Sequence, residues 1–185
     1  MHHIYHTEGF ILSSRNIAEA NKILSIYTEK LGLIIATVQG VRLYKSKLRF
    51  ALQDFSYAKI DLVKGHDIWR ITSAENLNSF ALARSEKKSL LLIAQVSKLI
   101  LRFCKGEDPD NRIFNDLIKA FHLLNNTDIN ESKKEALELH LVLKIMNSLG
   151  YIGESQILTN FINLDFNNNL KEELLDKKEL IITNI

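Results

Sequence analysis

The first 80 residues alternate short apolar runs with polar connections, a pattern typical of β-strands rather than helices. The runs are rich in β-branched and aromatic side chains, and they lie at residues 7–14, 23–28, 33–38, 55–63 and 68–74. Residues 29–32 and 64–67 have the composition of turns between neighbouring runs. Residues 15–21 are expected to form the bend after the first strand. The pattern therefore predicts five strands in the first part of the chain.

Residues 80 to 150 change to the helical period, in which apolar side chains recur three and four positions apart. Three helices are expected, at about 86–104, from 108 to about 124, and from 132 to about 149. The capping signals are Ser85, Asp108 followed by Pro109, Ser132, Gly106 and Gly150. The apolar stripes that should face a core include Ile113, Leu117, Phe121, Leu137, Leu141 and Ile145.

These elements predict an α+β protein with an N-terminal barrel domain and a small helical bundle. Five strands joined by one long connection favour a small closed barrel, and the OB-fold is the common five-stranded form. The expected domains are an OB-fold at 1–79, a helical domain at 80–152, and a C-terminal tail at 153–185 with one possible helix.

The charge pattern adds a functional expectation, because the long connection between the third and fourth strands is strongly basic. Arg42, Lys45, Lys47 and Arg49 fall within eight residues, and no Asp or Glu occurs between Lys30 and Asp54. Residues 1–80 hold ten Lys and Arg against seven Asp and Glu, whereas the remainder is close to neutral. A cationic connection beside a small sheet can hold a phosphate backbone. The alternative is an ordinary solvated surface loop.

Within this basic segment (residues 39–49), each residue has an expected role. The four cations are candidates for phosphate contacts, and Gly40 permits close backbone approach. Tyr44 is the best candidate for base stacking. Arg15 is a further DNA-binding candidate, with Lys22, Lys59 and Arg70 in second rank. Phe50 and Trp69 are expected to lie in the barrel core.

Composition argues against several other classes. An apolar fraction of 46% supports a buried core. The single cysteine, Cys104, excludes an internal disulfide, and we expect it to pack at a helix end. No apolar run reaches the roughly 18 residues of a membrane span, and the N-terminus lacks the features of a signal peptide, so a cytoplasmic location is expected. No phosphate loop, nucleophile elbow or zinc-protease motif occurs, so we expect neither an enzyme nor a cofactor.

Several stretches resemble one known family, the bacterial recombination mediator RecO. Residues 7–15 resemble the family's opening strand, 19–32 its second strand and turn, 38–42 with 45–49 its glycine-and-basic segment, and 149–151 the end of its third helix. Residues 52–55 resemble a stretch that usually has Pro where Asp54 stands. The resemblance covers about residues 5 to 152.

The resemblance implies an OB domain that binds single- and double-stranded DNA and anneals complementary strands. It also implies that the protein, with RecR, helps to load RecA on DNA coated by the single-strand-binding protein SSB, whose C-terminal tail it binds. Two departures stand out. The four cysteines of a zinc site that many members carry are missing here, and the chain is shorter than usual in its C-terminal part. The alternative function is an OB-fold adaptor with a mainly protein-binding role.

Overall fold

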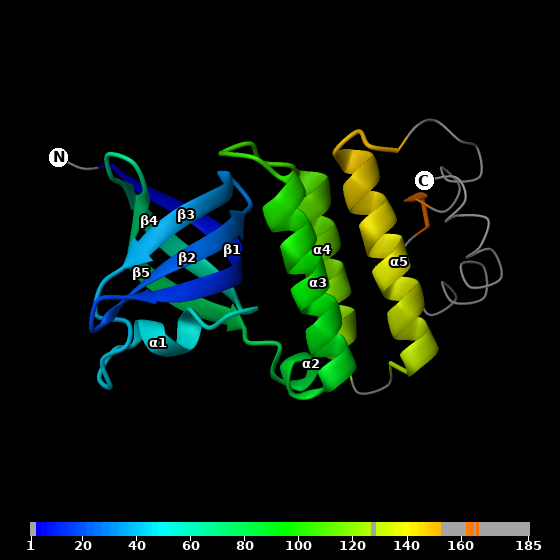
Figure 1. The fold of residues 1–185 in the computed structure, drawn as a ribbon, viewed down its shortest axis with the longest axis horizontal. Helices are drawn as coiled ribbons and strands as arrows, with labels where there is room; N and C mark the ends of the chain where they lie inside the picture. Colours follow the sequence, from blue (N-terminus) through cyan, green and yellow to red (C-terminus); the bar gives the residue numbers. More distant parts are fainter. Residues whose placement is uncertain (1–2, 127–128, 153–161, 165, 167–185) are drawn as a thin grey trace. The chain divides into compact units, whose positions relative to one another are not determined.

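The computed structural model describes residues 3–126, 129–152, 162–164 and 166 (Figure 1). The chain divides into two compact units. The barrel unit comprises Met1–Phe80 and Ser97–Asp110, and the helical unit comprises Ala81–Val96 and Asn111–Ile185. The domain limits expected from the sequence stay a prediction, and most of residues 153–185 lies outside the described part.

The barrel unit is a closed five-stranded barrel with the strand order β1-β2-β3-β5-β4. Its strands are β1 (Ile4–Ile17), β2 (Asn21–Thr28), β3 (Gly32–Val38), β4 (Tyr57–Lys64) and β5 (Trp69–Asn78). All neighbouring pairs are antiparallel except β3 and β5, which pair in parallel over a short register. The predicted OB-fold followed by helices is therefore confirmed.

The first strand is longer than the sequence indicated, because β1 serves two partners. Its beginning pairs with β4 and its end pairs with β2, so one bent strand closes the barrel. Where the two pairings overlap, a Cβ on Gly9 would lie only 2.8 Å from Ile26 Cγ2, so a side chain has no room there. The expectation of a bend over residues 15–21 is wrong. Arg15 continues the strand opposite Ile23, and the turn lies only at residues 18–20.

The barrel core is filled by the inward side chains of all five strands, and a short helix covers one end. This helix, α1 (Leu48–Ala51), was not predicted, because four residues carry no helical period. Its Ala51 and the following Leu52 are buried in the core, and Leu48 packs against it from the edge. The strand residues of this core cluster are Ile11, Leu24, Ile26, Ile34, Ala36, Val38, Ala58, Ile60, Leu62, Trp69 and Ile71.

A stretch that follows the long helix α3 also belongs to the barrel unit. We call residues 104–110 the strap. Its Glu107 accepts hydrogen bonds from the Trp69 indole Nε1 at 2.9 Å and from Lys64 Nζ at 2.7 Å. The hydrogen bond from Lys64 holds the pKa of the Glu107 carboxyl below its ordinary value, aided by the Trp69 indole. The strap thus fixes the ends of β4 and β5 through one carboxylate.

The helices are α2 (Ala81–Ser85), α3 (Lys87–Phe103), α4 (Asn111–Leu124) and α5 (Glu131–Ser148). The first part of α3 lies in the helical unit and its last part in the barrel unit. The three long helices and the stop at Gly150 were predicted, whereas the five-residue α2 was not. In the helical unit, α4 and α5 pack together, and the predicted stripe residues are buried, namely Ile113, Leu117, Phe121, Leu137, Leu141 and Ile145.

The helix starts differ from the sequence signals. Glu86, not Ser85, caps α3, because its carboxylate accepts the N–H groups of Lys88 at 3.0 Å and Ser89 at 2.7 Å. Asn130, not Ser132, caps α5 by accepting the Lys133 N–H. Helix α4 begins at Asn111, which leaves Asp108 and Pro109 outside it. Each helix thus begins within three residues of its sequence signal, but at a different residue.

Candidate nucleic-acid interface

The basic segment is an ordered chain of three β-turns rather than an open loop. The N–H of Leu43 donates to the carbonyl of Gly40 at 3.1 Å, that of Ser46 to Leu43 at 3.0 Å, and that of Arg49 to Ser46 at 3.3 Å. These i to i+3 hydrogen bonds fold the backbone at regular three-residue intervals. The backbone of the segment is therefore held in place before any ligand arrives.

Both ends of the segment are fixed by apolar side chains. At the first turn Val41 is only 2% exposed and belongs to the barrel core. At the last turn Leu48 packs against the same core. The middle turn, with Tyr44 and Lys45 at its corner, has no such anchor, and both of these residues are exposed. The segment thus projects its centre into solvent while its ends are buried.

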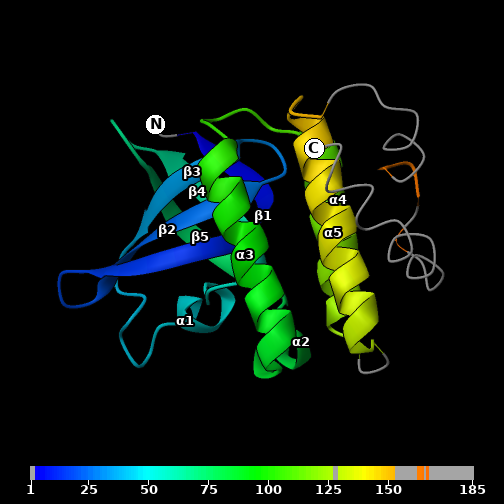
Figure 2. The same cartoon turned by 45° about the vertical axis from the view of Figure 1, so that its right-hand side comes forward.

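The turn between β1 and β2 holds the first part of the segment by hydrogen bonds. The Gly40 N–H donates to Asn21 Oδ1 at 2.9 Å, and the Arg42 N–H donates to the carbonyl of Ala20 at 3.0 Å. The Arg42 guanidinium also donates to the carbonyl of Ala18 at 3.2 Å. Gly40 has φ +64°, a left-handed conformation that glycine adopts without strain. The segment lies beside this hairpin end in both ribbon views (Figures 1 and 2).

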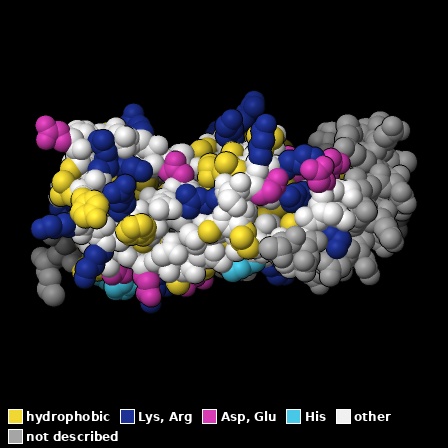
Figure 3. All heavy atoms as spheres, turned by 90° about the horizontal axis from the view of Figure 1, so that it is seen from below, with side chains coloured by type: hydrophobic (Ala, Val, Ile, Leu, Met, Phe, Trp, Pro, Cys, Tyr) yellow, Lys and Arg dark blue, Asp and Glu magenta, His cyan; other side chains and the backbone are white. Residues whose placement is uncertain are grey.

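All four predicted cations of the segment are exposed, namely Arg42, Lys45, Lys47 and Arg49. None of them forms an ion pair with another residue that the structure describes. The Arg42 guanidinium donates one of its five N–H groups to the Ala18 carbonyl, so other N–H groups remain for a ligand. Seen from below, dark blue Lys and Arg side chains surround yellow apolar ones over the barrel (Figure 3). The structure thus leaves all four predicted cations exposed along one ordered segment, whereas their binding to DNA stays a prediction.

A row of outward side chains extends this surface across four strands. The Cα partners run from Arg15 on β1 to Ile23 on β2, Thr37 on β3 and Arg70 on β5. Partners opposite each other point to the same face of a sheet, so an arginine lies at either end of this row. Strands β2 and β3 contain no Asp or Glu, whereas the other three strands contain one acid each. The β2–β3 strand pair is therefore free of acids, and the nearest acids in sequence, Glu19 and Glu29, lie in the turns at its two ends.

The second-rank cations have individual neighbours. The Lys22 ammonium donates to Ser14 Oγ at 3.2 Å. Lys59 lies between Glu8 on β1 and Glu75 on β5 in the strand register, in an acidic setting. Lys59 is thus the least suited of these residues to contact a phosphate.

The aromatic side chains divide into buried and exposed groups. Trp69 is 3% exposed, which confirms its predicted place in the core, but Phe50 is 71% exposed, so its prediction as a core residue is wrong. Tyr44 is 92% exposed. Tyr27 and Tyr57 are buried, with their hydroxyls donating to the Asp110 carbonyl and to the Glu8 carboxylate respectively. Among the described aromatic residues of the barrel unit, Tyr44 and Phe50 are the most exposed, so they are the candidates for stacking on a base.

The pattern around Phe50 contained a signal that places it outside. Leu48, Ala51 and Leu52 lie at positions i, i+3 and i+4, which form one face of a helical turn. That face is the one packed on the barrel, so Arg49 and Phe50 between them must point away. The signal spans five residues only, which is why the sequence pattern alone did not reveal a helix.

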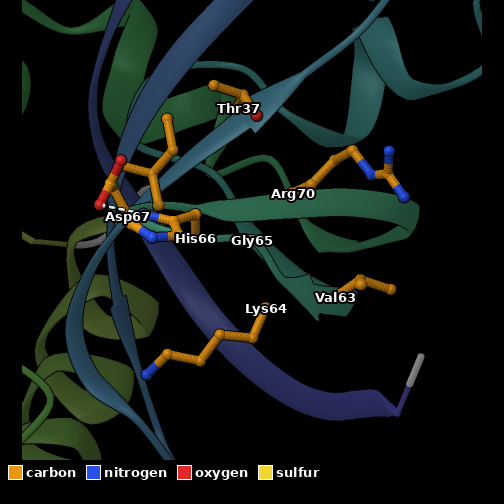
Figure 4. A pocket seen from close by; sticks show the side chains of 8 residues that line it. Thr37, Val63, Lys64, Gly65, His66, Asp67 and Arg70 are labelled. Carbon is orange, nitrogen blue, oxygen red and sulfur yellow. Dashed lines mark hydrogen bonds and ion pairs between the residues drawn. The ribbon is translucent and has the colours of Figure 1, made fainter.

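A hollow of about 440 Å³ lies at the turn between β4 and β5, beside the Thr37 and Arg70 end of the row of outward side chains. It is lined by Thr37, Val63, Lys64, Gly65, His66, Asp67, Ile68 and Arg70. The Arg70 and Lys64 side chains point in different directions, and His66 Nδ1 lies 2.7 Å from Asp67 Oδ1 (Figure 4). A catalytic or small-molecule site requires polar groups that converge on one point, and these groups do not converge.

Other reactive groups are accounted for by packing. Cys104 is buried directly after α3 as predicted, and burial raises the pKa of its thiol to about 11, so it is not a nucleophilic thiolate at neutral pH. Among the described residues, no group of three or more His, Cys, Asp or Glu side chains could hold a metal ion. None of the helices in the described ranges has the length and hydrophobicity needed to cross a membrane.

Comparison with known proteins adds the following. Residues 1–80 match the family described as Recombination protein O N terminal. The DNA repair protein RecO of Alkaliphilus metalliredigens is 31% identical over 159 residues, which is 85% of this chain and 61% of that protein. The proteins of the same description from Clostridium novyi and Dehalococcoides mccartyi are 28% identical over 80% of this chain and 31% identical over 76%, covering 57% and 55% of their own lengths. The chain thus spans about three fifths of the length of the curated relatives it matches.

Proposed function

We propose that this chain, which belongs to the RecO family of DNA repair proteins, is a DNA-binding recombination mediator whose barrel holds DNA against the basic segment. The observation that carries the proposal is the acid-free basic segment, fixed by three turns with its four cations exposed. A preformed cationic surface binds a polyanion without a large ordering cost.

The charge distribution of the barrel supports one path for the DNA over its surface. Strands β2 and β3 carry no acid, and the row that crosses them ends in Arg15 and Arg70. In OB-folds, this strand pair and the adjoining turns are the usual surface for oligonucleotides. A single strand that leaves the basic segment therefore continues over this face, with Gly40 allowing the backbones to approach closely.

The role in recombination rests on the family membership. We propose that the chain anneals complementary strands and, together with RecR, assists the loading of RecA on SSB-coated single-stranded DNA. The basic segment would hold the DNA and the near-neutral helical unit would dock protein partners, including the C-terminal tail of SSB. This activity would place the protein at the nucleoid. The proposed activity is the binding and annealing of DNA strands and assistance in RecA loading, so no covalent step or cofactor is assigned.

The test is the salt dependence of oligonucleotide binding by the full chain. Replacing Arg42, Lys45, Lys47 and Arg49 by Ala should reduce the slope of log affinity against log salt by about 3, because each phosphate contact on a single strand contributes about 0.7. This slope corresponds to roughly a 50-fold loss in affinity between about 50 and 200 mM salt.

The matched control removes the same charge elsewhere on the chain. It replaces four other exposed cations by Ala, namely Lys87, Lys98, Arg102 and Lys105. If both quadruple variants fold and lower the slope equally, net charge alone explains the binding and the segment has no special role. Strand annealing with bare and SSB-coated DNA then tests the mediator activity, and an intact annealing rate in the segment variant would contradict it. Absence of salt-sensitive DNA binding in the unaltered chain would favour the OB-fold adaptor function.

A further inference from the structure

Three large apolar side chains point into solvent from the basic segment and α1. Leu43 is 58% exposed, Tyr44 is 92% exposed and Phe50 is 71% exposed. They fall within eight consecutive residues, which contain the three cations Lys45, Lys47 and Arg49 and no acid. Large apolar side chains grouped on a surface commonly mark a binding site.

The fold does not require an aromatic residue at position 50. Helix α1 is held on the barrel by Leu48, Ala51 and Leu52, which face the core, whereas Phe50 lies on the opposite side. Arg49, its neighbour, is exposed on the same side. The 71% exposed ring therefore adds little to barrel packing.

The chemistry of this surface fits one ligand in particular. The cations favour an anionic partner, and the flat exposed rings favour a partner with accessible π-faces. A single DNA strand offers phosphates and unpaired bases in alternation. In a duplex the bases are stacked and paired inside, so their faces are closed to a protein surface, and a protein reaches only the phosphates, the sugars and the base edges in the grooves.

We infer that Phe50 and Tyr44 stack on unpaired bases and make the basic segment prefer single-stranded over double-stranded DNA. This inference rests on the proposed function, since it assigns a strand preference to the same surface. The cations supply attraction to both forms of DNA, and the two rings supply the difference between them. Tyr44 lies at the corner of the projecting middle turn, and Phe50 is fixed on α1.

The experiment compares the full chain with Phe50→Ala and Tyr44→Ala on one labelled single strand and on the same sequence as a duplex. Stacking of a base on an aromatic side chain predicts a loss of about 5- to 150-fold in single-strand affinity for each variant. The duplex affinity should stay within about twofold, and the salt slope on both forms should be unchanged because no phosphate contact is lost.

Two further variants separate stacking from general apolar contact. Phe50→Trp keeps a π-face and should retain the single-strand affinity, whereas Phe50→Leu keeps an apolar side chain and should lose about as much single-strand affinity as Phe50→Ala. Leu91→Ala, which removes an exposed apolar side chain from α3, is the control and should change neither affinity. Melting curves confirm that each variant is folded.

Three results would overturn the inference while leaving DNA binding intact. They are an unchanged single-strand affinity in Phe50→Ala, an equal loss on duplex, or full activity of Phe50→Leu. A chain that binds neither form of DNA in a salt-sensitive manner would instead refute the proposed function itself.

Discussion

The hydrogen bond between the Gly40 N–H and Asn21 Oδ1 allows the order of the basic segment to be tested without removing a cation. The bond is 2.9 Å long and joins the first turn of the segment to the start of β2. Asn21→Ala removes the acceptor and leaves the Gly40 N–H without this partner. The buried Val41 and the Arg42 bonds to the β1–β2 turn remain, so the segment should loosen rather than detach.

The size of the effect follows from the net value of one hydrogen bond, about 0.5 to 1.5 kcal/mol. If the segment must be ordered to bind DNA, the same free energy is lost on binding, which lowers the affinity for a single strand by about 2- to 12-fold. The salt slope should not change, because the number of phosphates neutralised is the same. The combination of weaker affinity and constant slope distinguishes lost order from lost charge.

Amide hydrogen exchange of the full chain measures the order directly, without DNA. Exchange at Gly40 and its neighbours in the segment should become faster in Asn21→Ala, while that of β4 is unchanged. Asn16→Ala is the matched control, since Asn16 is exposed on β1 opposite Lys22. Asn21→Asp keeps an oxygen acceptor, so it should retain slow exchange but bind DNA less tightly because it adds a negative charge.

Two outcomes would refute the reasoning. If exchange in the segment is unchanged in Asn21→Ala, this bond does not order it. If exchange becomes faster while single-strand affinity stays the same, a preformed segment is not needed for binding. Either result would leave the charge of the segment as the whole basis of the proposed interface.

Three further predictions concern the helical unit and metal. The hydrogen bond from Lys134, with those from the N–H groups at the start of α3, holds the pKa of the Glu86 carboxyl well below its ordinary value. The ionised carboxylate therefore stabilises the fold fully above about pH 4.5, and this stabilisation is lost as pH falls through the lower pKa of the folded protein. In urea unfolding, the free energy of unfolding should therefore fall less between pH 5 and pH 3 in Glu86→Gln than in the unaltered chain. Lys144→Ala removes the ammonium that lies 3.1 Å from the Asp116 carboxylate, and it should lower the free energy of unfolding by about 1 to 3 kcal/mol, whereas an unchanged free energy of unfolding would show that this ion pair does not stabilise the helical unit. Beyond Gly150 the sequence contains neither Cys nor His, so EDTA should not change the melting temperature, and stoichiometric zinc in the purified protein would contradict this expectation.

The sequence was sufficient for the elements with a strong period and insufficient where tertiary contacts decide. Five apolar runs and three helical stripes predicted the barrel and the long helices, because burial requires those side-chain patterns. The extension of β1 through Arg15 was missed, since its outward residues are polar and lack a period-two signal. Glu86 as the cap of α3 was missed because Ser85 is the more usual capping residue.

The candidate site shows the same division. Its cations are visible in the sequence because charges can be counted without knowledge of the fold, and the structure shows that all four are exposed. The exposure of Phe50 depends on which side of a four-residue helix meets the barrel, and Asn21 became relevant only when the β1–β2 turn was placed beside Gly40. Such contacts join distant residues through single bonds, which leave no repeating pattern along the chain.

The strap has a consequence for how the protein is made. Synthesis proceeds from the N-terminus at about 5 to 20 residues per second, so the strap is added roughly 2 to 6 s after the last barrel strand is complete. During this interval the Trp69 indole and the Lys64 ammonium have no Glu107 carboxylate to receive their hydrogen bonds. The ends of β4 and β5 are therefore free to fray until α3 has left the ribosome. A stalled or truncated product that ends near residue 80 would expose this incompletely bonded edge to proteases and chaperones.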